Sequence, residues 1–259
     1  MQQVALKPQF EWAARLGYAS RGIIYLVIGG LALGTAFSGG GETTGSRGAL
    51  QTLLEQPFGK GIVTLLALGL ICYAAWRATQ AISDTDEHGS DLKGMGIRAG
   101  MMASALAHLL LGIWAFSLVL SGAVASSASS GGSSGTSLSM WGLSVLGLGV
   151  IAAGIAYFIS GWQARFEKYL KIPPDYESWA KPVCRFGLIS RGVVYALVGI
   201  FILSSVWLSG GQEIKGIGDA LSWLYSQTFG VWLLGLTALG LLSFGVYSLL
   251  EAVYRRVDA

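Results

Sequence analysis

The chain alternates long apolar stretches with short polar connections. Six stretches consist almost wholly of hydrophobic and small residues. Each is long enough to cross a hydrocarbon core of about 30 Å, which takes roughly 20 helical residues. They cover residues 18–37, 61–82, 99–121, 141–162, 188–208 and 229–250. The pattern predicts an all-α, polytopic membrane protein with six transmembrane helices.

Three of these stretches carry polar and glycine positions with the same four-residue spacing. Steps of four place side chains along one face of a helix. The three sets are Gly17, Arg21, Tyr25 and Gly29; Gly100, Ser104, His108 and Gly112; and Gly187, Arg191, Tyr195 and Gly199. Three tandem copies of one unit are therefore expected, each a helical hairpin.

The repetition extends beyond these helices. Residues 15–25, RLGYASRGIIY, return as residues 185–195, RFGLISRGVVY, and the sequence of 49–76 is echoed at 220–247. A short amphipathic segment should therefore precede the second helix in the first and third units. Because the first stretch has a counterpart late in the chain, we do not expect it to be a cleaved signal peptide.

These matches set the expected boundaries. We predict a single membrane domain over residues 1–259, with repeats at 10–84, 94–165 and 181–256. Between the second and third repeats, residues 166–180 combine basic and aromatic side chains. This linker is expected to lie on the inner leaflet, where basic residues meet anionic lipid.

Composition supports the same class of protein. Hydrophobic residues make up 53% of the 259 residues and charged residues only 12%, and the mean hydropathy is +0.59. A soluble domain would carry about a quarter charged residues. The net charge of +3 follows from basic residues at the span ends and gives no reason to expect a nucleic-acid partner.

The basic residues gather at one set of span ends. Of the 17 lysines and arginines, all but Arg47, Lys60 and Lys215 precede or open the first span, lie in or flank the second and fourth connections, or lie near the C-terminus. Loops rich in lysine and arginine stay in the cytoplasm. Both termini are therefore predicted to be cytoplasmic.

Three units of one orientation favour symmetry about the membrane normal. A pseudo-threefold ring of six helices would bring the repeated stripes to one axis. One layer would hold Arg21, Ser104 and Arg191. A second layer, one turn or about 6 Å deeper, would hold Tyr25, His108 and Tyr195. The glycines expected to allow close helix packing are Gly17, Gly29, Gly100, Gly112, Gly187 and Gly199.

Ionisable side chains within spans are candidate binding groups, because charge in a membrane needs a partner or a cavity. Glu251 is the expected counter-ion for one arginine, in a polar layer with Gln80 and Gln163. The ligand-binding candidates are Arg21, Tyr25, Arg98, Ser104, His108, Arg191, Tyr195 and Glu251. The alternative interpretation is structural, with Arg21 and Arg191 extending to lipid phosphates while the aromatic side chains pack between helices.

The run Gly-x-x-x-Arg-Gly-x-x-Tyr-x-x-x-Gly at 17–29 and 187–199 resembles a bacterial membrane protein family, domain of unknown function 1206. Its members carry three tandem two-helix units, and the resemblance covers about residues 10–256. It implies a location in the bacterial plasma (inner) membrane and is silent on chemistry. The middle unit departs from the pattern at Ser104 and His108.

Two functions fit these observations. In one, a central polar layer binds or translocates a small anion, solute or lipid. In the other, the protein is a structural or accessory component that binds lipid or a partner membrane protein. Catalysis is not expected, because the chain has no recognisable nucleophile and base set and no phosphate-binding loop. Neither a cofactor nor a metal site is expected.

Overall fold

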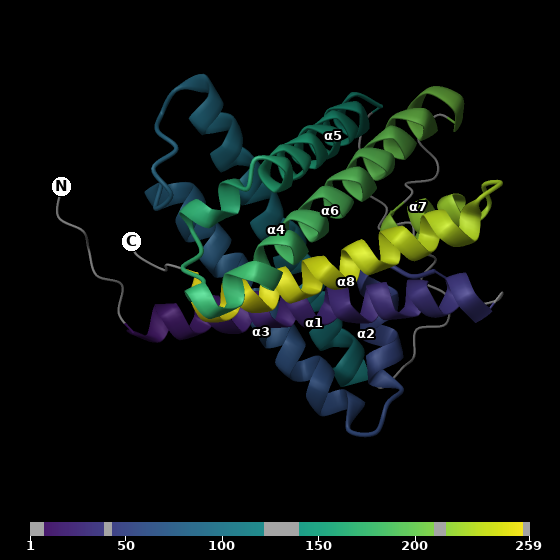
Figure 1. Cartoon of the computed structure of the whole chain (residues 1–259), viewed down its shortest axis with the longest axis horizontal. Coiled ribbons are helices and arrows are strands. Elements are labelled where there is room, and N and C mark those ends of the chain that lie inside the picture. The colour runs from purple at the N-terminus through teal and green to yellow at the C-terminus, as the bar shows by residue number, and fades with distance from the viewer. Residues whose placement is uncertain (1–7, 39–42, 122–139, 210–215, 256–259) are drawn as a thin grey trace.

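The computed structural model describes residues 8–38, 43–121, 140–209 and 216–255, and these form helices joined by short connections (Figure 1). The elements are α1 (Pro8–Ser38), α2 (Ser46–Leu54), α3 (Gly59–Ser83), α4 (Leu92–Ser121), α5 (Met140–Trp162), a short 3-10 helix η1 (Arg165–Lys168), α6 (Pro174–Ser209), α7 (Ile217–Tyr225) and α8 (Gly230–Tyr254). Six of them, all but α2, η1 and α7, are long and apolar enough to cross a membrane. The predicted all-α fold is confirmed.

The short helices α2 and α7 occupy the predicted amphipathic segments of the first and third units. Helix α6 begins earlier than its apolar stretch suggests. Pro174 opens it, and Asp175 and Glu177 lie in its first turn, where proline and acidic side chains favour a helix start. Part of the predicted linker at 166–180 is therefore the first turns of α6.

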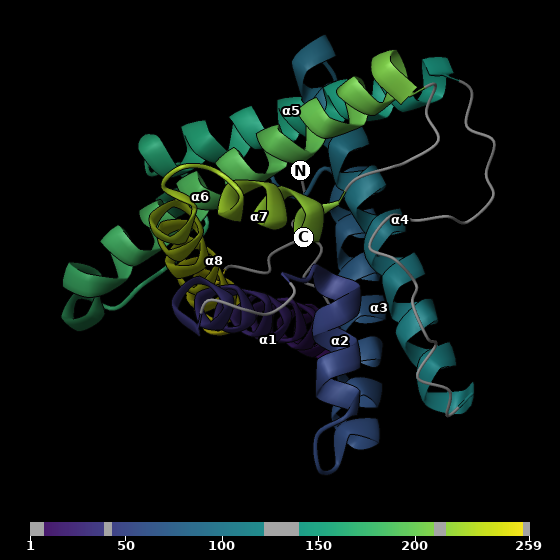
Figure 2. The ribbon, with the colours of Figure 1, turned by 90° about the vertical axis from the view of Figure 1, so that its right-hand side faces the viewer.

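The long helices pair between units more closely than within them. Helix α1 packs along α8, α3 along α4, and α5 along α6 (Figure 1). In the view of Figure 2, the α3/α4 and α5/α6 pairs diverge on either side of the α1/α8 pair. In each pair, the first long helix of one unit packs on the second long helix of the unit before it. For the first unit, the unit before it in the ring is the third. This is the pairing that a pseudo-threefold ring requires.

Glycines make these three pairings equivalent. The last glycine of each repeated stripe faces the neighbouring helix so closely that an added Cβ would lie within 3 Å of a side-chain carbon. The three contacts are Gly29 with Leu242 at 2.8 Å, Gly112 with Ile71 at 2.9 Å, and Gly199 with Ile151 at 2.6 Å. The predicted packing role of these glycines is confirmed, and the contacts align the three units residue by residue.

Arginines cap the same three pairs at the end where α1 begins. Arg15 on α1 donates to the carbonyl of Ala252 at the end of α8 at 2.7 Å. Arg98 on α4 does the same for α3, and Arg185 on α6 for α5. The last carbonyls of a helix lack intrahelical partners and carry negative partial charge. We call this side of the bundle the capped end.

The ring is open in the middle unit. Helix α1 packs on α3 and α6 on α8, but among the described residues α4 and α5 form no packed interface. A Cβ at Gly17 would lie 2.6 Å from Cα of Tyr73, and one at Gly187 would meet the backbone of Phe244. A Cβ at Gly100 would meet no described atom within 4 Å, so its predicted packing role is wrong. Its expected partner on α5 is Ala153, which is too short to fill the interface.

The open ring predicts different effects for one substitution at two equivalent glycines. Gly17→Val should lower the melting temperature of the detergent-solubilised protein, because overpacking typically costs about 1–3 kcal/mol. Gly100→Val should leave it nearly unchanged, because the added atoms face open space. Thermal unfolding followed by tryptophan fluorescence measures both. Equal losses would show that the middle unit is packed like the first.

Candidate functional site

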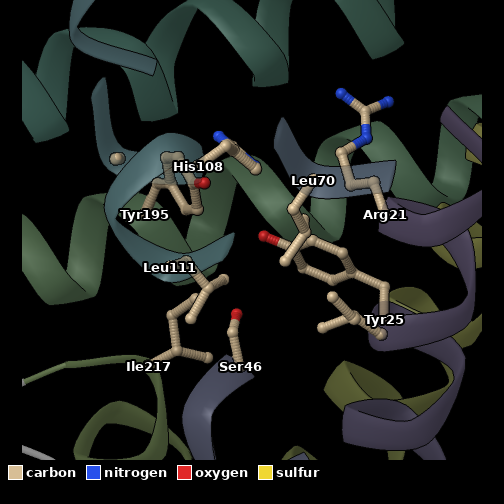
Figure 3. A pocket seen from close by; sticks show the side chains of 10 residues that line it. Arg21, Tyr25, Ser46, Leu70, His108, Leu111, Tyr195 and Ile217 are labelled. Atoms are coloured by element: carbon tan, nitrogen blue, oxygen red, sulfur yellow. The ribbon is translucent and has the colours of Figure 1, made fainter. Parts of the chain in front are cut away.

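A largely apolar pocket of about 150 Å³, with a few polar side chains in its wall, lies where the three repeated stripes face one another (Figure 3). Its walls come from α1, α3, α4 and α6, with α2 and α7 contributing one residue each. The lining residues are Arg21, Ile24, Tyr25, Ser46, Leu70, Ala107, His108, Leu111, Tyr195 and Ile217. The structure thus brings together four of the predicted candidates, one or more from each repeat.

Arg21 is held by an internal ion pair. Its side chain is buried and forms a salt bridge with Glu251 of α8. Its Nε donates to Ser248 Oγ at 3.1 Å, and Nη1 donates to the Tyr73 hydroxyl. Glu251 as counter-ion of an arginine is therefore confirmed. Arg21 spans three helices, α1, α3 and α8, and ties them together close to the capped end.

Arg191, at the equivalent position of the third unit, has no such partner. It is only 2% exposed, and its Nη2 donates to the Tyr195 hydroxyl at 2.6 Å. Its Nε and Nη1 have no hydrogen-bond partner within the described ranges. Arg21 is also only 4% exposed, so both arginines point into the bundle and neither side chain extends outward to the phosphates of the surrounding lipid.

Aromatic rings surround the Arg191 guanidinium instead of a carboxylate. Its Cζ lies 4.1 Å from the ring centre of Phe244 and 4.6–4.8 Å from those of Tyr25, Tyr157 and Tyr195. Cation–π contacts contribute roughly 0.5–2 kcal/mol each. They reduce the free-energy cost of burying the charge but leave two donor nitrogens, Nε and Nη1, without a hydrogen-bond acceptor in the described residues.

The repeat alignment explains this difference between the two arginines. The acceptors of Arg21 come from Tyr73, Ser248 and Glu251. The aligned glycine contacts place Phe244, Tyr157 and Ser160 at the corresponding positions around Arg191. Phe244, which has no hydroxyl, stands in the place of Tyr73. The short hydroxyl of Ser160 stands in the place of the Glu251 carboxylate. The third unit has kept the cation and lost its counter-ion.

His108 faces the pocket from α4. Its Nδ1 lies 2.7 Å from the backbone carbonyl of Ser104, which can only accept, so Nδ1 carries a proton. In the neutral ring Nε2 is then left as an acceptor. The imidazole packs against the Tyr73 ring with centroids 4.7 Å apart. Ser104 itself is half-buried beside His108 and does not line the pocket.

Arg98, one of the predicted ligand-binding residues, lies outside the pocket. Its Nε and Nη2 donate to the carbonyls of Ala81 and Ile82 at 2.7 and 2.9 Å. The alignment makes it the counterpart of the capping arginines, not of Arg21. Gln163 is exposed and accepts from Arg165, so it is not part of the predicted polar layer either.

Sequence reasoning missed a second charged cluster at the capped end. Arg255 pairs with Glu251 at 2.6 Å and with Asp86 at 3.3 Å, and buried Gln80 donates to Asp86 at 2.9 Å. Asp86 belongs to a loop that the sequence alone suggests is solvated. The four-residue spacing of Glu251 and Arg255 was the available signal for their pairing.

The loop that carries Asp86 is shaped by its own hydrogen bonds. The backbone N–H groups of His88 and Gly89 donate to the Asp84 carboxylate at 2.8 and 2.7 Å. Because these donors favour the charged form, they lower the pKa of Asp84. The loop positions Asp86 against Arg255 in this way.

Cations outnumber carboxylates in the interior. Arg21, Arg191 and Arg255 are buried, and Arg77 adds a partly buried guanidinium whose Nε has no partner in the described part of the chain. Glu251 and Asp86 are the carboxylates paired with them. His108 and Tyr157 both lie within electrostatic range of Arg21, Arg77 and Arg191. The centre of the bundle is therefore a cationic site rimmed by tyrosines.

Removal of the Glu251 charge should destabilise the bundle. Glu251→Gln leaves two buried arginines around one neutral amide, and breaking a buried ion pair typically costs about 3–5 kcal/mol. The matched control is Glu177→Gln, whose exposed ion pair with Lys181 should add little. Thermal unfolding in detergent measures both variants. A small effect at Glu251 would contradict its central role in holding Arg21.

Comparisons with known proteins agree with this architecture. A family model described as Domain of Unknown Function (DUF1206) matches residues 16–84 and 186–255, which are the first and third units. "Uncharacterized protein YxxB" of Bacillus subtilis (strain 168) is 29% identical over 257 residues, covering 97% of this chain and 93% of its own. No solved structure matches the chain. Since the family model spans more than half of its length, this membrane protein belongs to the DUF1206 family.

Proposed function

We propose that this protein binds a small anion, or the anionic headgroup of a larger molecule, at its central cationic site. The observation that carries the proposal is Arg191, a buried guanidinium with two unpaired donor nitrogens, Nε and Nη1, and no carboxylate partner in the described residues. A buried charge without a partner is strongly unfavourable. An anion supplies both the missing charge and the missing acceptors.

Electrostatics favours this solution over the aromatic contacts alone. Two unit charges about 4 Å apart interact by roughly 4 kcal/mol at the effective dielectric constant of a protein near its surface. Guanidinium groups also form short, bidentate hydrogen bonds with carboxylate and phosphate oxygens. The cluster of Arg191, Arg77 and the Arg21–Glu251 pair carries more positive than negative charge, so one bound anion would reduce the imbalance.

The pocket limits the size of the ligand. Its volume of about 150 Å³ is below the range of roughly 300–1,000 Å³ usual for drug-sized ligands. The hydroxyl of Tyr25 points into it (Figure 3). Arg191 does not line the pocket itself, but it donates a hydrogen bond to the hydroxyl of Tyr195, which does. A single phosphate or carboxylate group fits these donors, and any larger part of the ligand would lie outside.

We propose binding without a catalytic step. Ser46 and His108 both line the pocket, but Nδ1 of His108 is bonded to its own helix. No described carboxylate lines the pocket with them. We also propose that the capped end faces the cytoplasm from the bacterial inner membrane, because most of the basic residues flank it.

Phosphate should stabilise the protein through Arg191. The wild type, delipidated in a non-ionic detergent, is titrated with sodium phosphate against sodium chloride of equal ionic strength. At 100 times Kd, ligand binding contributes about 2.7 kcal/mol, or a rise in Tm of roughly 5–10 °C for a chain of this size. Arg191→Gln should abolish the rise without lowering the Tm measured in chloride, because it removes an unpaired charge.

Arg98→Gln is the matched control for this experiment. It removes a guanidinium that caps α3 and lies outside the pocket, so it should lower the Tm in chloride and keep the phosphate response. Absence of a phosphate response in the wild type would contradict the proposal. So would an equal response in wild type and Arg191→Gln.

A further inference from the structure

The open seam between α4 and α5 is lined by small residues. On α4 and α5, six positions at helical spacing face the gap where the ring would close. They are Gly100, Ala103 and Ala107 on α4, and Gly149, Ala153 and Ala156 on α5. All but Ala153 are exposed, and a Cβ at Gly149, like one at Gly100, would meet no described atom within 4 Å.

Large aromatic side chains fill the equivalent seams of the other two units. Between α1 and α3, Tyr18, Tyr73 and Trp76 form a buried cluster, with Trp76 Nε1 donating to the Tyr18 hydroxyl at 2.9 Å. Between α6 and α8, Phe244 and Tyr247 occupy the same positions. The middle unit substitutes alanine for both aromatics, which leaves an unfilled slot.

The slot leads to the central pocket. Ala107 lines the pocket and is also an exposed residue, so the pocket reaches the molecular surface beside α4. No residue of α5 is among those that line it. The neighbouring surfaces carry exposed Leu106, Leu110 and Ile155, as expected for helices that face hydrocarbon. A molecule in the bilayer can therefore reach the pocket sideways, and the wall of the pocket includes Tyr195, the hydrogen-bond acceptor of Arg191.

We infer that the ligand is an anionic phospholipid, which lies between α4 and α5 with its phosphate at the central arginines. This rests on the proposed anion site and specifies what fills it. Arg191 is six residues from the capping Arg185, or about 9 Å along the helix. A lipid of the leaflet at the capped end therefore brings its phosphate there by a short inward shift.

The slot suits the remainder of such a lipid. Acyl chains gain about 0.8 kcal/mol for each CH₂ group kept from water, and the described residues of α4 and α5 form no packed interface that would exclude an acyl chain. A free phosphate ion has the same charge but would gain nothing from the slot. The observations together, an unpaired buried cation and an apolar side opening, therefore favour lipid over a free ion.

The inference predicts that filling the slot blocks lipid but not phosphate. Ala153→Tyr/Ala156→Trp gives α5 the residues that α3 carries at positions 73 and 76. The matched control, Leu148→Tyr/Ile155→Trp, adds the same side chains at positions that are 59% and 52% exposed on α5. Phosphatidylglycerol binding is measured by native mass spectrometry, and inorganic phosphate by the thermal shift described above. Circular dichroism and gel filtration check that each variant is folded.

We expect the filled-slot variant to bind phosphatidylglycerol at least tenfold more weakly than the wild type and the control, with its phosphate response retained. Unchanged lipid binding in this variant would overturn the inference and leave the anion site intact. So would a wild type that responds to phosphate but binds no lipid, or a stable dimer that covers the slot. A wild type that binds neither phosphate nor lipid would overturn the proposed function itself.

A second measurement needs no variant. A photoactivatable phosphatidylglycerol with the reactive group near its headgroup is bound to the wild type in nanodiscs and activated. Peptides from α4 and α5 should carry most of the label, and excess unlabelled phosphatidylglycerol should reduce it more than neutral phosphatidylcholine. Equal labelling of all six long helices, or equal competition by both lipids, would contradict a specific site in the slot.

Discussion

A guanidinium buried in a membrane protein has to be neutralised, and much of this structure follows from how each arginine meets that constraint. Arg21 does so with Glu251, and the same carboxylate engages Arg255, which also reaches Asp86. These bonds join α1, α3 and α8 at the capped end. Arg191 meets the constraint with aromatic faces and one tyrosine hydroxyl, and its unpaired donors are the basis for proposing an external anion at this position.

Repetition and divergence have separate roles in this molecule. The three units share the glycine contacts at Gly29, Gly112 and Gly199 and the arginine caps on their neighbours, and these shared features set the pseudo-threefold arrangement. Each unit then differs where the chemistry lies. The third has lost the counter-ion, and the middle has alanines in place of the aromatics that seal a seam. The missing counter-ion lies near the axis of the bundle, and the alanines lie at the side opening next to it.

Local periodicity was sufficient to predict the helices, the repeated units and the four stripe residues that line the pocket. The charge of Glu251 at the end of a span indicated that it is a counter-ion. What it missed depends on which helices meet. Arg98 is an arginine close to the apolar stretch of α4, but its role depends on the end of α3 lying beside α4. Gly100 matches its counterparts in sequence, yet whether it packs is decided by α5, about 50 residues away. Asp86 lies in an acidic loop and reaches the interior only because the loop folds back on Arg255.

The central claim is that Arg191 is neutralised by something other than the protein. The most direct test is a cryo-electron microscopy structure of the wild type in nanodiscs that contain phosphatidylglycerol. We predict non-protein density within about 3 Å of Nε and Nη1 of Arg191, the distance of a hydrogen bond, continuing between α4 and α5. A carboxylate of the chain paired with Arg191, or α5 closed against α4 with no space between them, would contradict the account.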